Sequence, residues 1–380
     1  MKSKVNRSAS RGKVCHLTSV HRVNDIRIFR KECATLSRAG FDVTLVGVKS
    51  PEILSGTNIQ IVNLPTPENR ATRMIGQTYR VYREALKANA QVYHFHDPEL
   101  LPCGLMLKKF TGAKVVFDSH ECFREDVVEK DWIPKILRKS VSYGVGAIED
   151  FVVEKIDLVI AATPHIEKFF SSRANSVVTI NNYPIADEFK FPNLQEIDRT
   201  GVCYAGALSP ARGILPFLDA VALIDRDIPV HIAGTFANDA FEEAVRSHPS
   251  WRYITYHGQV DRKVVGQIYA SCFAGIVTLL PAPNHVNSQP NKLFEYMSSG
   301  LAVIGSNFPI WKSVIEDGEA GLLVDPSSPS QIAAAIQVLH EDRVRAERMG
   351  QQGARLVREL YNWNREGERL VEVYDDLLAS

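Results

Sequence analysis

Short apolar runs alternate with amphipathic segments along most of the chain. The runs are rich in valine, isoleucine and leucine, as in strands buried on both faces. The segments between them have apolar residues at helical spacing. This alternation predicts βαβ units and therefore parallel sheets covered by helices. Strands are predicted in the first half at residues 13–19, 41–48, 59–65, 91–96, 114–120, 157–163 and 176–182.

The alternation stops once, in a polar stretch with prolines at residues 184–200, and then restarts. We interpret this stretch as a linker. It would join a Rossmann-like domain at 13–183 to a second one at 201–360. The second half has predicted strands at residues 201–206, 228–234, 252–258, 274–280, 301–306 and 321–325.

Three further segments complete the predicted organisation. Residues 1–12 are basic and polar, and we expect them to be mobile. The first helix is predicted from about Asp25 to Ala39, with Gly40 just beyond its end. Residues 361–380 are predicted to form a helix that packs back across the domain boundary.

Composition and charge exclude several classes of protein. Among 380 residues, 44 Lys and Arg balance 44 Asp and Glu, so the net charge of +0 gives no general attraction to nucleic acid or anionic lipid. The six cysteines lack CxxC spacing, which favours reduced thiols and a cytoplasmic location. No stretch approaches the roughly 18 apolar residues of a membrane span, and we expect no export signal.

The segment PNKLFEYMSSG, residues 290–300, predicts a short helix whose first turn is charged. Lys292 lies near the helix N-terminus, where free N–H groups and a cation favour an anion such as phosphate. Glu295 could accept two hydrogen bonds from a sugar diol. The alternative is a surface ion pair between these two residues, worth a few tenths of a kcal/mol.

Two other strand ends of the second half carry candidate ligand contacts. YAGALSPARGI, residues 204–214, places Gly206 and Arg212 before a helix, and YHGQVDRK, residues 256–263, offers an open backbone edge. Ligands of open parallel sheets bind beyond the carboxyl ends of the strands. Together with residues 290–300, these ends match the phosphates, base and ribose of a nucleoside diphosphate.

These segments, with NSQPNKLFEYMSSG, resemble the donor-binding half of the retaining glycosyltransferases of family 4. HFHDPELLP and FDSHE in the first half are similar to the same family. The resemblance covers residues 13 to 378. It implies an α/β protein of the GT-B fold, with two Rossmann-like domains that face a central cleft.

The resemblance implies donor contacts residue by residue. Glu295 would bind the ribose, Lys292 and Arg212 the diphosphate, and Gln259 and Val260 the base. Two positions depart from the family pattern: Asn287 stands where a second glutamate is common, and Ala207 where an arginine is common in the phosphate loop. The complete predicted donor set is Gly206, Arg212, Gln259, Val260, Asn287, Lys292, Leu293 and Glu295.

In the first half, His96 and Asp97 end an apolar strand. A histidine there is often structural, but the resemblance places His96 beside the reacting sugar. With Asp97, Lys292 and Arg212 it forms the predicted catalytic set. Asp25 could alternatively be only a helix N-cap. The predicted acceptor set is His21, Asp25, Arg27, His120 and Glu121.

The implied reaction is transfer of a hexose from a UDP or GDP sugar, with retention, to a glycan or lipid-linked glycan during surface or exported polysaccharide synthesis. Lys292 and Arg212 would stabilise the departing diphosphate. We expect no cofactor and no metal ion. The DRD at residues 225–227 fits a metal-binding pattern but precedes a strand, so we treat it as coincidence.

Two other function classes remain open at this point. One is a nucleotide-sugar 2-epimerase of the same fold, and the other is a catalytically idle nucleotide-sugar-binding partner, suggested by Asn287 and Ala207. Residues 131–155 mix apolar and basic side chains, either for core packing or as an interfacial helix. If these residues form an interfacial helix, we expect a cytoplasmic protein that makes peripheral contact with the inner face of the membrane.

Overall fold

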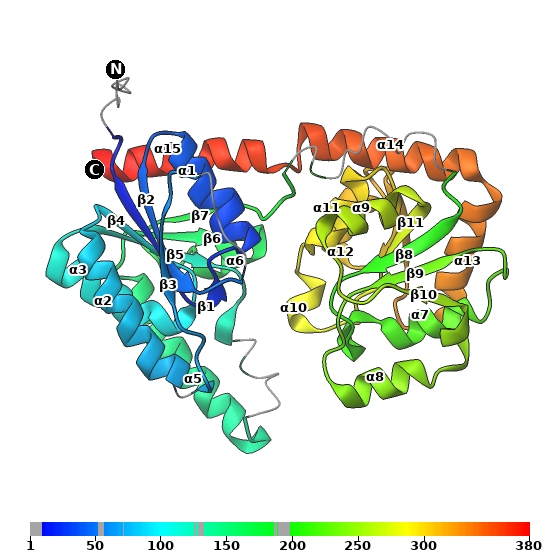
Figure 1. Ribbon diagram of the computed structural model, residues 1–380, viewed down its shortest axis with the longest axis horizontal. Helices are drawn as coiled ribbons and strands as arrows, with labels where there is room; N and C mark the ends of the chain where they lie inside the picture. Colours follow the sequence, from blue (N-terminus) through cyan, green and yellow to red (C-terminus); the bar gives the residue numbers. More distant parts are fainter. Residues whose placement is uncertain are drawn as a thin grey trace. The chain divides into compact units, whose positions relative to one another are not determined.

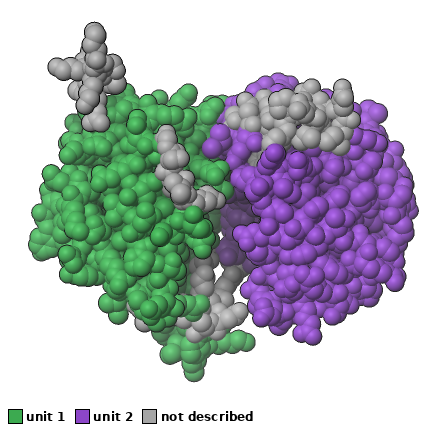
Figure 2. All heavy atoms as spheres, viewed as in Figure 1, with its two compact units in different colours: residues 1–182, 363–380 green, residues 183–362 purple. Residues whose placement is uncertain are grey.

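The computed structural model describes residues 10–51, 57–70, 72–124, 127, 133–185, 188 and 198–380. The chain forms two compact units, which we call unit 1 and unit 2 (Figures 1 and 2). Unit 1 contains residues 1–182 and 363–380, and unit 2 contains residues 183–362. Residues 1–9 of the predicted mobile N-terminus and most of the predicted linker lie outside the described residues.

Unit 1 is built on a parallel sheet with the strand order β3-β2-β1-β4-β5-β6-β7. Each predicted strand of the first half is confirmed. Apolar runs buried on both faces, such as Leu158–Ala161, explain why these segments form inner strands. The strands are β1 Lys13–Arg22, β2 Asp42–Val48, β3 Gln60–Leu64, β4 Val92–Phe95, β5 Lys114–Ser119, β6 Leu158–Ala161 and β7 Val177–Thr179.

Helices cover this sheet, and the first of them differs from the prediction. Residues Ile26–Cys33 are wound as a π-helix, η1, and only Ala34–Arg38 continue as an α-helix, α1. The C-terminal helix α15 packs against both within unit 1 (Figure 1). The other helices of unit 1 are η2 Thr72–Gln77, α2 Thr78–Ala88, η3 Pro98–Leu100, α3 Leu101–Thr111, α5 Lys135–Val153, α6 Pro164–Phe170 and α15 Trp363–Ala379.

Unit 2 has a second parallel sheet with the order β10-β9-β8-β11-β12-β13. The predicted strands of the second half are also confirmed, as β8 Gly201–Ala205, β9 Val230–Ala233, β10 Ile254–Tyr256, β11 Cys272–Val277, β12 Ala302–Ser306 and β13 Gly321–Val324. Its helices are η5 Pro210–Arg212, α7 Ile214–Val221, α8 Asp239–Arg246, η6 Pro249–Tyr253, α9 Arg262–Ala270, α10 Pro283–Val286, α11 Asn291–Ser298, α12 Pro309–Ile315, α13 Pro329–Glu341 and α14 Arg343–Glu359.

The central strands of each unit place candidate side chains at its carboxyl edge. In unit 1, β1 and β4 are neighbours in a register that pairs His16 with His94. In unit 2, β8 and β11 are neighbours. The segment after β8 carries Gly206 and Arg212, and the segment after β11 leads through Asn287 into helix α11 with Lys292 and Glu295. No helix of the described residues is long and apolar enough to cross a membrane.

Candidate active site

Lys292 is a buried cation in the first turn of α11. Its side chain is held there because the helix anchors Leu293, Phe294 and Met297 in the core of unit 2. Lys292 is 7% exposed, and its Nζ has no hydrogen-bond partner among the described residues. Nζ lies 3.9 Å from the centre of the Tyr204 ring. Lys292 is therefore not half of a surface ion pair with Glu295.

Burial and the positive charge of Arg212 lower the pKa of Lys292 to about 7, which the charge of Glu295 only partly opposes. Arg212 lies in η5, half-buried, and its guanidinium has no ion-pair partner among the described residues. The two positive charges therefore repel one another, and no carboxylate of the described residues is bound to either. An anion placed between them would relieve this repulsion.

Two glycines give the loop after β8 its shape. Gly206 has a φ of 141°, and a Cβ there would lie 2.5 Å from the Lys292 Nζ. Gly213 has a φ of 69°, and its Cβ would lie 1.9 Å from the Thr278 carbonyl oxygen. Any larger residue would clash or be strained at either position. The predicted donor residue Gly206 therefore lies directly against the buried lysine.

Glu295 is held by a cation that the sequence analysis did not select. Its Oε1 accepts hydrogen bonds from both Nη atoms of Arg262 at 3.2 Å, and Tyr269 donates to its Oε2 at 3.4 Å. Arg262 also forms an ion pair with Glu188 at 2.7 Å. The segment YHGQVDRK contained a signal for Arg262, because this arginine stands one residue after the N-cap Asp261, at the start of a helix. Glu295 is thereby fixed in direction with part of its side chain still exposed.

The remaining predicted donor residues lie in three places on unit 2. Gln259 is exposed and Val260 half-buried, just after Gly258, whose φ is 68°. Asn287 is half-buried and directly follows α10. Leu293 is fully inside the core, so its side chain anchors α11.

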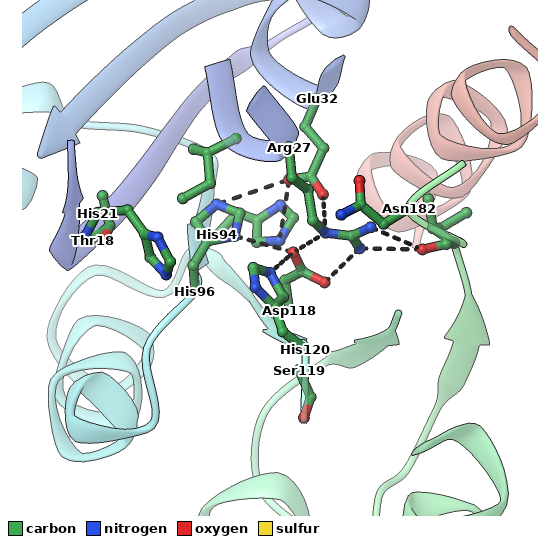
Figure 3. A network of polar contacts seen from close by, with 12 residues as sticks. Thr18, His21, Arg27, Glu32, His94, His96, Asp118, Ser119, His120 and Asn182 are labelled. Atoms are coloured by element: carbon green, nitrogen blue, oxygen red, sulfur yellow. Dashed lines mark hydrogen bonds and ion pairs between the residues drawn. The ribbon is translucent and has the colours of Figure 1, made fainter. Parts of the chain in front are cut away.

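In unit 1, Asp118 at the end of β5 is the centre of a buried polar network (Figure 3). Arg27 binds it through Nη2 at 2.7 Å and Nε at 2.9 Å, and His96 and His120 reach it at 3.0 and 2.7 Å. Burial opposes ionisation of Asp118. The charge of Arg27 and the two histidines nevertheless hold its pKa well below the usual range.

His96 lies inside this network. Its side chain is fully buried, with Nδ1 directed at Asp118 and Nε2 at 3.1 Å from Nδ1 of His16. Burial lowers the pKa of His96, although its contact with Asp118 opposes this shift. The rings that retain exposure are those of His120 and His21, at 26% and 35%. Contact of His96 with the reacting sugar stays a prediction.

Asp97 holds the carboxyl-terminal half of β1. Its Oδ2 accepts hydrogen bonds from the Thr18 hydroxyl at 2.8 Å and the Ser19 N–H at 2.6 Å. Asp97 is 3% exposed, and its Oδ1 lies 3.5 Å from Nε2 of His21. In this structure Asp97 thus positions His21, and its predicted catalytic role is untested.

The predicted acceptor residues fall into an inner and an outer group. Asp25 caps η1 by accepting from the Ile28 N–H at 3.0 Å, and its place in the acceptor set stays a prediction. Burial raises its pKa, but His21 and this N–H bring it down to about 2. Arg27 is enclosed, with its donors on Asp118 and the Ile180 carbonyl, so an acceptor would have to displace these partners. His21, His120 and the exposed Glu121 remain accessible.

Several polar residues of this network were missed. His16, Glu32 and His94 are fully buried around His96, and Tyr374 of α15 contacts His94 at 2.6 Å. The alternation in HFH was a usable signal for the histidines, because residues two apart on a strand share one face. Glu32 gave none, since a charged residue in an amphipathic helix is expected on its exposed face.

Comparison with known proteins supports the class that the fold and these strand ends define. A family model described as glycosyl transferases group 1 matches residues 199–342, and one described as glycosyltransferase family 4 matches residues 28–182. The structure superposes on sucrose-phosphate synthase from Thermosynechococcus elongatus with a TM-score of 0.75 at 19% identity, covering 97% of this chain and 99% of that one. For Anabaena HepE in complex with UDP-glucose the TM-score is 0.74 at 13% identity, with 96% and 100% covered.

The chain is thus a glycosyltransferase enzyme of the GT-B fold. Phosphatidyl-myo-inositol mannosyltransferase from Mycolicibacterium smegmatis is 33% identical over 360 residues, which cover 90% of this chain and 86% of the relative. The protein of the same name from Mycobacterium leprae is 29% identical over 317 residues, covering 79% and 77%. The chain belongs to glycosyltransferase family 4.

Proposed function

We propose that this enzyme transfers a hexose, with retention, from a UDP or GDP sugar to a glycan or lipid-linked glycan in the synthesis of surface or exported polysaccharide. The observation that carries the proposal is a pair of cations: Lys292, which lies against Gly206, and Arg212, whose charge acts on Lys292. Within the described part of the chain, neither has a carboxylate bound to it. A diphosphate supplies the missing negative charge. Two relatives named phosphatidyl-myo-inositol mannosyltransferase support mannose and a lipid acceptor as the first to test.

The chemistry would depend on charge that develops as the sugar leaves. Departure of the nucleoside diphosphate places new negative charge on the phosphate, and fixed cations in a site with little water stabilise it. Lys292 and Arg212 would supply these cations, while Glu295, oriented by Arg262, would accept the ribose hydroxyls. Gln259 and Val260 would lie beside the base. No protein nucleophile, cofactor or metal ion is required in this scheme.

The donor is tested with a panel of UDP and GDP hexoses, using thermal stabilisation as the measurement. The true donor at 100 times its dissociation constant should add about 2.7 kcal/mol to the free energy of unfolding. The stabilisation should be lost in Lys292→Met. Transfer should persist in EDTA, and NMR of the product should show the anomeric configuration of the donor. Loss of all activity in EDTA, or an inverted product, would contradict the proposal.

The same NMR experiment separates the alternatives. A 2-epimerase would convert the donor sugar to its epimer in the absence of acceptor. A catalytically idle binder would be stabilised by the donor without hydrolysing it. We expect instead slow donor hydrolysis that disappears in Lys292→Met.

We also propose peripheral contact with the cytoplasmic face of the membrane through α5. Ile136, Leu137 and Tyr143 are 87%, 50% and 82% exposed on this helix, whose N-terminal part also carries Lys135, Arg138 and Lys139. An exposed helix with this composition suits a membrane interface. Reversing the three basic charges to glutamate should reduce sedimentation with vesicles that contain anionic lipid, and leave donor binding unchanged. Equal sedimentation of the variant would refute the contact.

A further inference from the structure

Four ionisable side chains in unit 1 meet at one point, and we call them the histidine cluster: His16, Glu32, His94 and His96. They come from β1, η1, β4 and the residue just beyond β4. Glu32, His94 and His96 are labelled in Figure 3. All four side chains have 0% exposure. Fully buried groups of this kind are rare unless they are paired or bind a metal ion.

The cluster has the dimensions of a metal site. Oε2 of Glu32 lies 3.8 Å from Nδ1 of His16, 4.0 Å from Nε2 of His94 and 3.8 Å from Nε2 of His96. The His16 and His96 nitrogens are 3.1 Å apart. Four ligands at zinc bond lengths of 2.0–2.1 Å in a tetrahedron are about 3.4 Å from one another. These atoms could therefore close around one ion with small shifts.

Three of the four ligands also have a partner on the side that faces away from the proposed ion, as metal ligands usually do. Nδ1 of His94 contacts the Tyr374 hydroxyl at 2.6 Å, and Nδ1 of His96 contacts Asp118 at 3.0 Å. Oε1 of Glu32 forms an ion pair with Nε of Arg27 at 3.0 Å. Such outer partners fix the ring or carboxylate and leave the opposite atom directed inward. At that inner side, Nε2 of His94 and Oε2 of Glu32 have no hydrogen-bond partner among the described residues.

We propose that the histidine cluster binds one zinc ion through His16 Nδ1, Glu32 Oε2, His94 Nε2 and His96 Nε2. Three imidazoles and one carboxylate suit zinc, and a set of four protein ligands with no exposed surface is typical of a structural site. The ion joins β1, η1 and β4 beneath the outer histidines His21 and His120. It is separate from the donor cations of unit 2, so transfer itself remains independent of added metal.

Two other groups of residues are weaker candidates. His96, Asp118 and His120 also lie close together, but Oδ2 of Asp118 already accepts from Arg27 and from both histidines. Asp225, Asp227 and His340 form a surface group without a buried ligand. His120 and His340 supply matched controls, because substituting either one removes a metal-binding side chain that is not among the four proposed ligands.

The test is the metal content of the full chain, produced with zinc in the medium and dialysed against a chelating resin. Mass spectrometry of total metal should find about one zinc ion per chain. Glu32→Gln and His94→Gln should retain less than about a tenth of this amount, whereas His120→Gln and His340→Gln should retain all of it. Circular dichroism shows which variants are folded.

A second measurement uses the unmodified chain and so does not depend on the folding of variants. Protein produced with cobalt should show the intense visible absorption of a tetrahedral Co²⁺ site. Wild-type protein without bound zinc or cobalt, or with the weak absorption of an octahedral ion, would overturn the proposal. Loss of metal in His120→Gln or His340→Gln, with retention in folded Glu32→Gln, would assign the ion to one of the other groups and equally overturn it.

Discussion

Lys292→Met is expected to reduce transfer by about 10²–10³-fold and at the same time to stabilise unit 2. The loss of activity follows because a preorganised charge at a developing anion has an effect of this size. The gain in stability follows because Lys292 is buried with a pKa near 7, so its charged form is unfavourable in the free enzyme. Methionine has nearly the same length and no charge to bury. Steady-state kinetics and calorimetry of the same preparations measure both effects.

The pH dependence of diphosphate binding tests whether the buried charge of Lys292 is responsible for these effects. The pKa of Lys292 in the free enzyme is about 7, and a bound diphosphate should raise it. Binding near pH 8 should then take up a proton, and affinity should fall as pH rises above 7. Calorimetry in buffers of different ionisation enthalpy detects this uptake. The exposed Lys312 supplies a control, since Lys312→Met should change neither activity nor proton uptake. Uptake that persists in Lys292→Met would assign the proton to another group.

The sequence predicted the fold well because the signal for buried parallel strands is local. Runs such as Leu158–Ala161 and Cys272–Val277 are apolar at every position, which only a strand covered on both faces requires. The candidate site could then be placed at the carboxyl ends of the strands, because ligands of open parallel sheets bind there. The predictions for Lys292 and Gly206 depended on this topology, and the structure brings these two residues together.

The buried polar network was not predictable by the same reasoning. Pattern analysis assigns charged helix residues to the surface, yet Arg27, Lys31 and Glu32 of η1 are all buried. These side chains lie on a segment wound as a π-helix, and their partners come from distant parts of the chain. Arg27 binds Asp118, and Lys31 donates to Asn182 at 2.7 Å. Such pairings are properties of the tertiary structure, which no local pattern encodes.

The C-terminal helix illustrates the same limit. A helix was predicted at residues 361–380, but its polar contacts were not. Within unit 1, Trp363 donates to the Thr35 hydroxyl at 2.9 Å, and Glu366 accepts from the Asn181 N–H at 2.8 Å. Tyr374 reaches His94 in the buried network. The helix therefore supports the candidate site as well as covering the sheet.

Asp118→Asn is expected to lower the free energy of unfolding of unit 1 by about 3–5 kcal/mol. Removing one partner of a buried ion pair leaves the other charge without compensation, and here that charge is Arg27. An asparagine has one acceptor oxygen for the donors that now share two, and its NH₂ group would face another donor. For a unit of this size the loss corresponds to a fall of about 10 °C in Tm, which calorimetry measures.

Asp150→Asn supplies the matched control, because Asp150 also pairs with arginines in unit 1 but is 43% exposed. Exposed pairs contribute about 0–1 kcal/mol, so this variant should change Tm little. Equal effects of the two substitutions would show that the network around Asp118 is no more stabilising than a surface pair. If the buried network acts as we infer, Asp118→Asn also releases His96 and His120 from their shared acceptor. Transfer at temperatures where the variant is still folded should then fall, whereas donor binding in unit 2 should not.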